Sequence, residues 1–260
     1  MSDFEYSREG GVATMLLNRP ARKNSFTLPM IDDWVASLRE AKDDPEVKVL
    51  VLRGEGDAFC SGLDLTTVDD HGMAPLARKA MLHDHVQHIP RLVAELDKPL
   101  IAAVSGVAVG AGMDMALMCD LRVASHNARF CESYIRVGLV PGAGGLYFLS
   151  RLVGTSKALE LFLTGDFVGA EEAHRIGLVN RLVEGEDLLS ETYGLAERLA
   201  AGPPVATRLI KRALYQSAES DLRTALDLVS SHMAVIQSTE DSREALAAFA
   251  EKRPPRYTGR

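Results

Sequence analysis

The chain has 260 residues and a formal net charge of -7, with 47% hydrophobic and 25% charged residues. These are ordinary globular values, and a chain of this length buries a full core without disulfides. The acidic balance argues against nucleic acid as a partner, because binding a phosphate backbone requires an excess of Lys and Arg.

The cysteines and the N-terminus set the expected compartment. Cys60, Cys119 and Cys131 are an odd number without CxxC spacing, which favours a reducing compartment and argues against a zinc site or a disulfide framework. The first ten residues have neither the basic nor the apolar part of a signal peptide. No apolar run reaches the roughly 18 residues of a membrane span. A cytoplasmic protein that does not insert into membranes is expected.

Strands alternate with helices over the first 186 residues. The pattern predicts a hairpin ending in a strand at 12–17, a helix at 28–42, a strand at 47–52, a partly helical stretch to about 96, a strand at 99–104, a tight loop at 106–112 that enters a helix, short strands at 121–124 and 128–131, helices through 152 and at 157–163, and a last strand at 178–183. Residues 187–260 are expected to be helical, with a break at Pro203-Pro204 and a basic, Pro-rich tail whose end is expected to be disordered. The fold class is therefore α/β, with an N-terminal core at 1–186 and a helical region at 187–260.

Two loops carry the chemical interest. Residues 59–64 read FCSGLD, and residues 106–114 read GVAVGAGMD just before an apolar helix. Glycine lets the backbone approach a ligand closely, and free N–H groups at a helix start attract negative charge. One N–H from each loop could hold a developing oxyanion. The alternative is close strand–helix packing without a ligand. Neither loop makes a dinucleotide fingerprint, and residues 142–145 do not make a P-loop.

At these residues the chain resembles the crotonase, or enoyl-CoA hydratase/isomerase, superfamily. The similar segments follow in the family's order and span nearly the whole chain: LNRPARKNSF (17–26), GEGDAFCSGLDL (54–65), IAAVSGVAVGAGMDMALMCDL (101–121), VGLVPGAGG (137–145) and FAEKRPP (249–255). The resemblance implies a spiral of ββα units, capped by C-terminal helices that form a homotrimer or a dimer of trimers. It also implies an acyl-CoA thioester as ligand, with coenzyme A as part of the substrate and no separate cofactor.

The resemblance also implies site residues. The oxyanion donors would be the N–H groups of Ser61 and Ala111. Two such donors stabilise an enolate by several kcal/mol in a dry site. The expected substrate-binding residues come from the two loops, from a basic segment before them and from the C-terminal end: Arg22, Lys23, Ala58, Phe59, Gly62, Leu63, Asp64, Gly110, Phe249 and Lys252.

The departures from the family pattern bear on the reaction. Enoyl-CoA hydratases of the family hold two glutamates around one water. Here the first position is Asp114 and the second is Tyr134, a phenol with an ordinary pKa of about 10. Gly142 stands where some isomerases carry an Asp. Asp114 is a candidate acid or base, or merely a residue that suits the helix dipole. Tyr134 could be a donor, a pocket wall or a core aromatic, and Glu132 is a candidate substitute carboxyl.

The expected function is that of an enzyme of enoyl-CoA hydratase/isomerase type, with weak or absent crotonyl-CoA hydration because one carboxylate is missing. Alternatives are a thioester hydrolase or decarboxylase that uses the same enolate, and a catalytically weak acyl-CoA-binding protein.

No metal is expected. His83, His85 and His88 lie close together in the sequence but lack an HExxH pattern. Ser61 lacks the surroundings of a nucleophile elbow.

Overall fold

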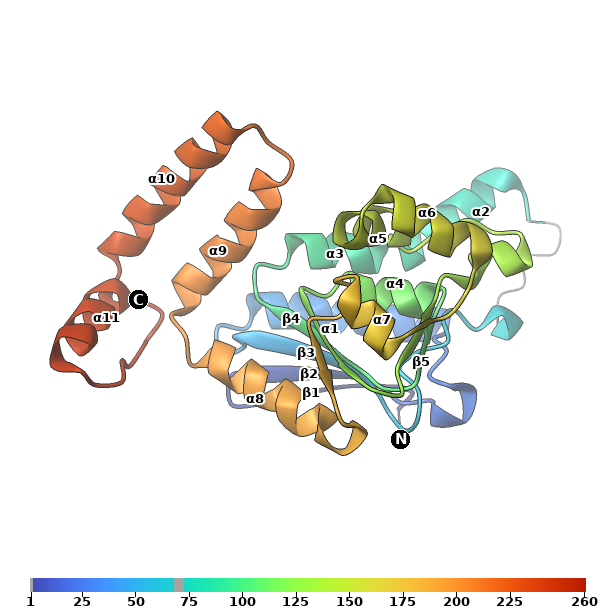
Figure 1. Cartoon of the computed structure of the whole chain (residues 1–260), viewed down its shortest axis with the longest axis horizontal. Helices are drawn as coiled ribbons and strands as arrows, with labels where there is room; N and C mark the ends of the chain where they lie inside the picture. The colour runs from blue at the N-terminus through green and yellow to red at the C-terminus, as the bar shows by residue number, and fades with distance from the viewer. Residues whose placement is uncertain (1, 68–72) are drawn as a thin grey trace.

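Two sheets form the centre of the computed structural model, which describes residues 2–67 and 73–260 (Figure 1). The larger sheet has the order β1-β2-β3-β4-β6-β9, and the smaller has the order β5-β7-β8. Strand β1 is antiparallel to β2, and the other neighbours in the larger sheet are parallel. The strands are β1 (Phe4–Glu9), β2 (Val12–Leu17), β3 (Val49–Gly54), β4 (Leu100–Val104), β5 (Val107–Val109), β6 (Leu121–Ser125), β7 (Arg129–Cys131), β8 (Val168–Gly169) and β9 (Arg181–Val183).

Helices cover the sheets and continue beyond them. They are α1 (Leu28–Asp43), α2 (Pro75–Met81), α3 (His88–Glu95), α4 (Ala111–Leu117), α5 (Gly145–Val153), α6 (Thr155–Thr164), α7 (Ala170–Arg175), α8 (Leu188–Ala200), α9 (Pro204–Ser217), α10 (Leu222–Ser238) and α11 (Glu240–Glu251). Short 3-10 helices are η1 (Pro20–Arg22), η2 (Leu65–Thr67), η4 (Ser133–Val137) and η5 (Gly185–Asp187), and η3 (Leu82–Val86) is a short π-helix. None of the described helices is long and apolar enough to span a membrane.

The chain repeats a ββα unit. Strand β4 enters the larger sheet, β5 enters the smaller sheet, and α4 follows. Next, β6 enters the larger sheet, β7 enters the smaller sheet, and η4 and α5 follow. This confirms the predicted spiral of ββα units. The repeat brings the start of α4 and the segment after β7 to the same place, since β5 and β7 are paired in parallel from Val107 and Arg129 onward.

Both faces of the larger sheet are buried at its central strands β3 and β4, whereas the edge strand β1 ends in exposed residues. Successive side chains on a strand point to opposite faces, and in β3 Leu50 and Leu52 join the main core with Trp34 of α1. Val49 and Val51 join a second cluster, against which α8 packs. A continuous apolar run is what such a two-sided strand requires. Because α8 packs on the sheet, the helices that leave the core begin with α9.

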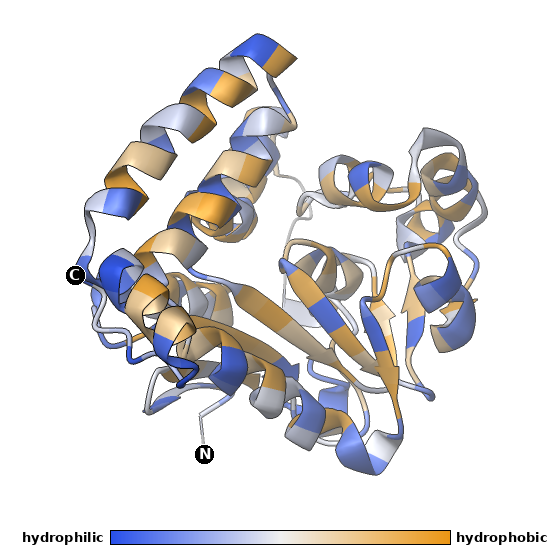
Figure 2. Ribbon diagram, turned by 60° about the vertical axis from the view of Figure 1, so that its left-hand side comes forward, coloured by the Kyte–Doolittle hydropathy of each residue, from blue (hydrophilic) through white to orange (hydrophobic). Residues whose placement is uncertain are grey.

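Helices α9 and α10 project from the core, as Figures 1 and 2 show. Neither contains a buried residue. Large apolar side chains are exposed along them and on α11: Ile210, Leu214, Leu222, Leu226, Val229, Met233, Val235, Leu246 and Phe249. An apolar surface of this extent indicates an interface.

Some local predictions were wrong. The expected loop at 106–112 contains β5, and β8 and α7 were not predicted. The C-terminal tail is ordered, because the N–H groups of Thr258 and Gly259 donate to the carboxylate of Asp241 at 2.6 and 2.9 Å. Asp241 is 2% exposed and lies at the start of α11. Burial of this carboxylate under the tail explains why composition alone misjudged the segment.

Candidate active site

The start of α4 presents free backbone N–H groups. Gly110 precedes the helix with φ 52° and ψ -124° and offers no side chain as a cap. The first N–H groups of a helix have no acceptor within it. Among residues 2–67 and 73–260, no acceptor bonds the N–H of Ala111. This N–H therefore remains available to a ligand.

The first loop lies against this helix start. A Cβ on Gly62, whose φ is +97°, would lie 3.0 Å from the Val109 oxygen and 3.4 Å from the Ala111 nitrogen. Only glycine combines this φ with so close an approach. The two loops that the sequence singled out are therefore adjacent in space.

Leu63, rather than Ser61, supplies the free N–H of the first loop. The N–H of Phe26 donates to the Gly62 oxygen, and the N–H of Asp64 donates to the Phe26 oxygen, both at 2.9 Å. Because Gly62 and Asp64 both bond to Phe26, the N–H of Leu63 between them points away from Phe26. In the described part of the chain this N–H has no acceptor. The Ser61 N–H is already bound to the Lys23 oxygen at 2.9 Å. In this structure the N–H of Leu63 is therefore available to a ligand, whereas the N–H of Ser61, which the sequence analysis named, already has an acceptor.

One helical turn into α4, Asp114 is buried among polar groups. It is 0% exposed, and its Oδ2 accepts the Tyr134 hydroxyl at 2.7 Å and the Ala143 N–H at 3.2 Å. The Tyr134 ring lies beside the turn at Gly110 that begins α4, since a Cβ on Gly110 would be 3.9 Å from its Cε2 atom. Glu132 is 1% exposed in the same cluster. The three candidate catalytic residues of the sequence are therefore brought together.

Burial dominates the electrostatics of this cluster. It raises the pKa of Asp114 to about 6, although the hydrogen bond from Tyr134 acts in the opposite direction. Burial, followed by the charge of Asp114, also raises the pKa of Glu132 to about 10. The same two causes raise the pKa of Tyr134 above its ordinary value, so this phenol stays protonated and donates.

Gly145 is required by the position of Asp114. A Cβ at this residue would lie 2.0 Å from Asp114 Oδ1, which is far inside van der Waals contact. Gly145 begins α5, so alanine suits the backbone and the carboxylate would have to move. We expect Gly145→Ala to fold and to lose about tenfold or more in kcat, because Asp114 is the candidate acid or base and a displacement of about 1 Å at a reacting centre can cost about a hundredfold. Equal kcat values for the two proteins, with Asp114 unmoved in a crystal structure of the variant, would contradict this placement.

Other predicted binding residues of the first loop have structural roles. Phe59 is 1% exposed and belongs to the core. The Ala58 oxygen accepts Asn24 Nδ2 at 2.7 Å. Asp64 is held by Arg19 at 3.1 Å and by the Thr66 hydroxyl at 2.6 Å. The carboxylate of Asp64 therefore fixes the loop and is not free for a ligand.

The predicted basic residues are divided between the two ends of the molecule. Arg22 and Lys23 are exposed beside the first loop, and Lys23 pairs with Asp57 at 2.5 Å. Phe249 is 87% exposed and Lys252 ends α11, far from α4 in the same chain (Figure 1). One chain alone does not bring Phe249 and Lys252 to the site.

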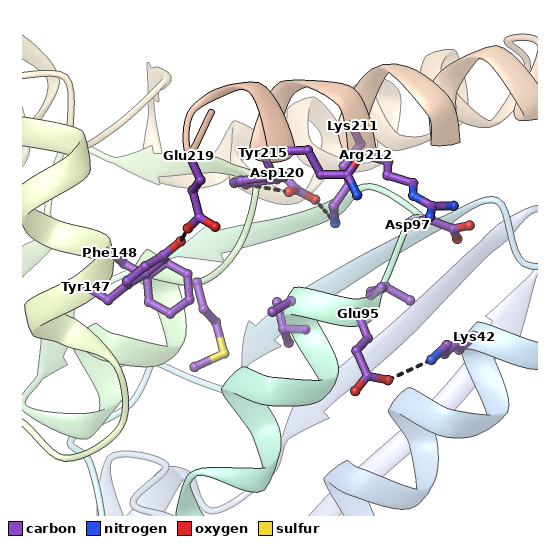
Figure 3. A pocket seen from close by; sticks show the side chains of 15 residues that line it. Lys42, Glu95, Asp97, Asp120, Tyr147, Phe148, Lys211, Arg212, Tyr215 and Glu219 are labelled. Atoms are coloured by element: carbon purple, nitrogen blue, oxygen red, sulfur yellow. Dashed lines mark hydrogen bonds and ion pairs between the residues drawn. The ribbon is translucent and has the colours of Figure 1, made fainter. Parts of the chain in front are cut away.

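A pocket of about 480 Å³ lies at the opposite end of α4 (Figure 3). There Asp120 accepts hydrogen bonds from Lys211 at 2.6 Å and from Tyr215 at 2.8 Å. These bonds join α9 to the core. The cavity is lined by Lys42, by the end of α3, by Met118 and Phe148, and by α9. Sequence patterns did not indicate it.

The histidine segment at 83–88 lies outside the cluster of Asp114, Tyr134 and Glu132. His83 contacts Asp84 at 2.7 Å and is exposed. In the ranges that the structure describes, no group of three His, Cys, Asp or Glu residues has the arrangement of a metal site. The site residues that the sequence analysis did not name are Ala143 and Gly145. They belong to the GAGG run at 142–145, which was rejected as a P-loop and otherwise entered only through the family resemblance and Gly142.

Comparisons with known proteins agree on one family. A sequence model of the enoyl-CoA hydratase/isomerase family matches residues 7–260. The chain is 37% identical to the 1,2-epoxyphenylacetyl-CoA isomerase of Escherichia coli K12, with 100% of both proteins covered. It is 36% identical to the short-chain-enoyl-CoA hydratase of Clostridium acetobutylicum, over 95% of this chain and 94% of the relative. The crystal structure of an enoyl-CoA hydratase from Bacillus anthracis superimposes with a TM-score of 0.94 at 31% identity, covering 100% of both chains.

Proposed function

The chain belongs to the enoyl-CoA hydratase/isomerase family, and on that premise we propose that it moves the double bond of an enoyl-CoA thioester through an enolate. The observation that carries this proposal is the position of Asp114. A buried carboxylate whose pKa is raised to about 6 lies one helical turn from the free N–H of Ala111. A base poised near neutral pH beside oxyanion donors is what proton abstraction next to a thioester needs.

The proposed reaction uses groups of the chain itself. The thioester oxygen accepts the N–H groups of Leu63 and Ala111. Asp114 takes a proton from the substrate carbon, and the C–H electron pair moves through the conjugated system onto that oxygen as an enolate. Asp114 then returns the proton two carbons away, the double bond shifts, and the carbonyl forms again. No step needs a cofactor beyond the coenzyme A of the substrate.

Tyr134 has a supporting part in this scheme. Its pKa is raised by burial and by Asp114, so it stays a neutral phenol over the working range of pH. It donates to Asp114 at 2.7 Å and holds the carboxylate beside the oxyanion loop. A neutral phenol is a poor replacement for the base that would activate water.

Isomerisation is therefore expected to exceed hydration. Hydration requires a base for water and an acid for carbon, and a positioned acid or base is worth about 10²–10⁴-fold. We expect the kcat for a short 3-enoyl-CoA to exceed that for crotonyl-CoA hydration by about a hundredfold. Both rates are followed by the absorbance of the conjugated enoyl thioester. Crotonyl-CoA hydration at about 10³ per second, the upper part of the ordinary enzyme range, would contradict this preference.

The exposed side chains of α9, α10 and α11 support a homotrimer or a dimer of trimers. Such an assembly would cover the apolar surface and let Phe249 and Lys252 of one subunit reach the coenzyme A bound by another. We expect sedimentation at micromolar concentration to give the mass of a trimer or a hexamer. A monomer under these conditions would contradict the assembly without affecting the assignment of Asp114.

A further inference from the structure

Glu132 has no hydrogen-bond partner for either carboxyl oxygen in the described part of the chain. Its side chain is also almost fully buried, with 1% exposure. An ionised carboxylate that is buried without a donor costs several kcal/mol. Glu132 therefore needs either a donor or a proton of its own.

The neighbouring carboxylate, that of Asp114, has one oxygen that lacks a hydrogen-bond donor. Asp114 Oδ1 is likewise buried without a partner, whereas Oδ2 accepts Tyr134 and Ala143. Both orphaned groups lie around Gly145, since a Cβ there would be 2.0 Å from Asp114 Oδ1 and 3.1 Å from Glu132 Oε1. A proton between the two groups would satisfy one oxygen of each.

We propose that Glu132 carries a proton at neutral pH and donates it as a hydrogen bond to Asp114 Oδ1, so that the two side chains form an acid–carboxylate pair with one negative charge. The value of the pair for turnover rests on the proposed function, in which Asp114 is the base. The presence of the proton does not depend on that function, because it follows from burial and geometry alone.

The groups that face Glu132 agree with this assignment. Burial is the main cause that keeps its pKa high, followed by the charge of Asp114. From η4 the other titratable neighbour is Tyr134, which is a donor to Asp114. Two backbone N–H groups also face Asp114 and carry no charge. They belong to Ala143, in the loop before α5, and to Gly145, the first residue of α5. None of these groups is a cation that would draw the proton off Glu132.

Glu132 is thus a positioning residue. Both of its oxygens are shielded from solvent, so it acts on the substrate only through Asp114. Its hydrogen bond fixes the orientation of Asp114, and its neutral state keeps a second negative charge away from the enolate. This gives a function to a residue that stands two positions before the place where the family carries its second glutamate.

Infrared spectroscopy of the whole protein tests the proton directly. The difference spectrum between the wild-type protein and Glu132→Gln at pH 7 is expected to show the carbonyl stretch of one buried carboxylic acid. The exposed Glu186→Gln is the matched control and is expected to show no such band. A difference spectrum with only carboxylate bands would overturn the proposal.

The same band can be followed without any variant, which covers the case in which Glu132→Gln does not fold. The wild-type band is expected to persist at pH 8 and to disappear as the pH passes about 10, the pKa of Glu132. Its absence, or its loss below pH 6, would overturn the proposal. Neither spectrum involves a substrate, so a failure of the proposed enzymatic function would be seen separately as a lack of isomerisation.

Thermal unfolding gives a second readout of the proton. Because the folded pKa of Glu132 lies above its unfolded value of about 4.5, its stabilising effect is complete below that value and is lost as the pH rises toward about 10. Glu132→Gln cannot ionise and does not show this loss. From pH 5 to pH 9 the Tm of the wild-type protein is therefore expected to fall by about 10 °C or more relative to that of the variant. A constant difference in Tm would count against the proposal.

Kinetics then separate positioning from mere packing. Glu132→Gln retains an N–H donor for Asp114, so it is expected to keep kcat within about threefold at pH 7. In the wild-type protein, ionisation of Glu132 near pH 10 is expected to lower kcat, and Glu132→Gln cannot ionise and is expected to lack this loss. Glu132→Leu removes the donor and is expected to lower kcat about tenfold while KM stays the same. Equal kcat values for all three proteins would remove the positioning role.

Discussion

Replacing Asp114 with asparagine is expected to lower the isomerisation rate about a thousandfold, within the range of about 10²–10⁴ for a positioned acid or base. Asparagine keeps the shape of the side chain and can still accept from Tyr134 and Ala143, which bind Oδ2 in the wild-type protein. It cannot take a proton from carbon. The measurement is kcat and KM for a short 3-enoyl-CoA, and we expect KM to change little.

The control for this variant is Asp32→Asn, which removes an exposed carboxylate from α1. It is expected to leave kcat unchanged. The pH profile adds a further test, because Asp114 must be ionised to act as a base and burial raises its pKa to about 6. The wild-type kcat is therefore expected to fall about tenfold for each pH unit below 6. Near-normal turnover of Asp114→Asn would remove Asp114 from the reaction.

Replacing Ala111 with proline is expected to lower kcat by about a hundredfold or more, since one oxyanion donor is worth roughly 3 kcal/mol. Ala111 is the first residue of α4, where proline suits the helix and removes only an N–H that has no acceptor in the helix. The substitution therefore deletes the proposed donor and leaves the helix in place. Steady-state kinetics and circular dichroism together measure both effects.

Thr155→Pro is the matched control for Ala111→Pro. It places proline at the first residue of another helix, α6, again after a glycine with positive φ, at an exposed position away from the site. We expect it to keep full activity. A folded Ala111→Pro protein with wild-type kcat would show that this N–H does not hold the enolate oxygen.

Hydrophobic patterns predicted most of the fold because they report burial. The first four positions of β3, 49–52, are all apolar, since Leu50 faces one layer and Val51 the other. Short strands such as β5 are held mainly by long-range pairing with β7, which local patterns do not contain. The tail was misjudged for the same reason, because its partner Asp241 lies 17 residues before Thr258.

The sequence analysis named residues that lie together in the structure, but it did not predict which of their backbone groups are free. Glycine patterns singled out both loops, and the family resemblance added the candidate role of Asp114. The choice between Ser61 and Leu63 depends on which N–H the Phe26 and Lys23 segments leave free. The position of Glu132 against Asp114 depends on the turn at η4 and on the missing side chain of Gly145. Neither arrangement can be read from spacing along the chain.

Deuterium exchange tests the enolate mechanism most directly. A short 3-enoyl-CoA is incubated with the enzyme in deuterium oxide, and the recovered thioester is analysed by mass spectrometry and proton NMR. The mechanism predicts that the wild-type enzyme shifts the double bond and introduces deuterium at the carbons that exchange protons with Asp114, and that Asp114→Asn does neither at a comparable rate. A double bond that stays in place with no deuterium in the recovered thioester, under conditions in which the folded wild-type enzyme binds the substrate, would contradict the mechanism.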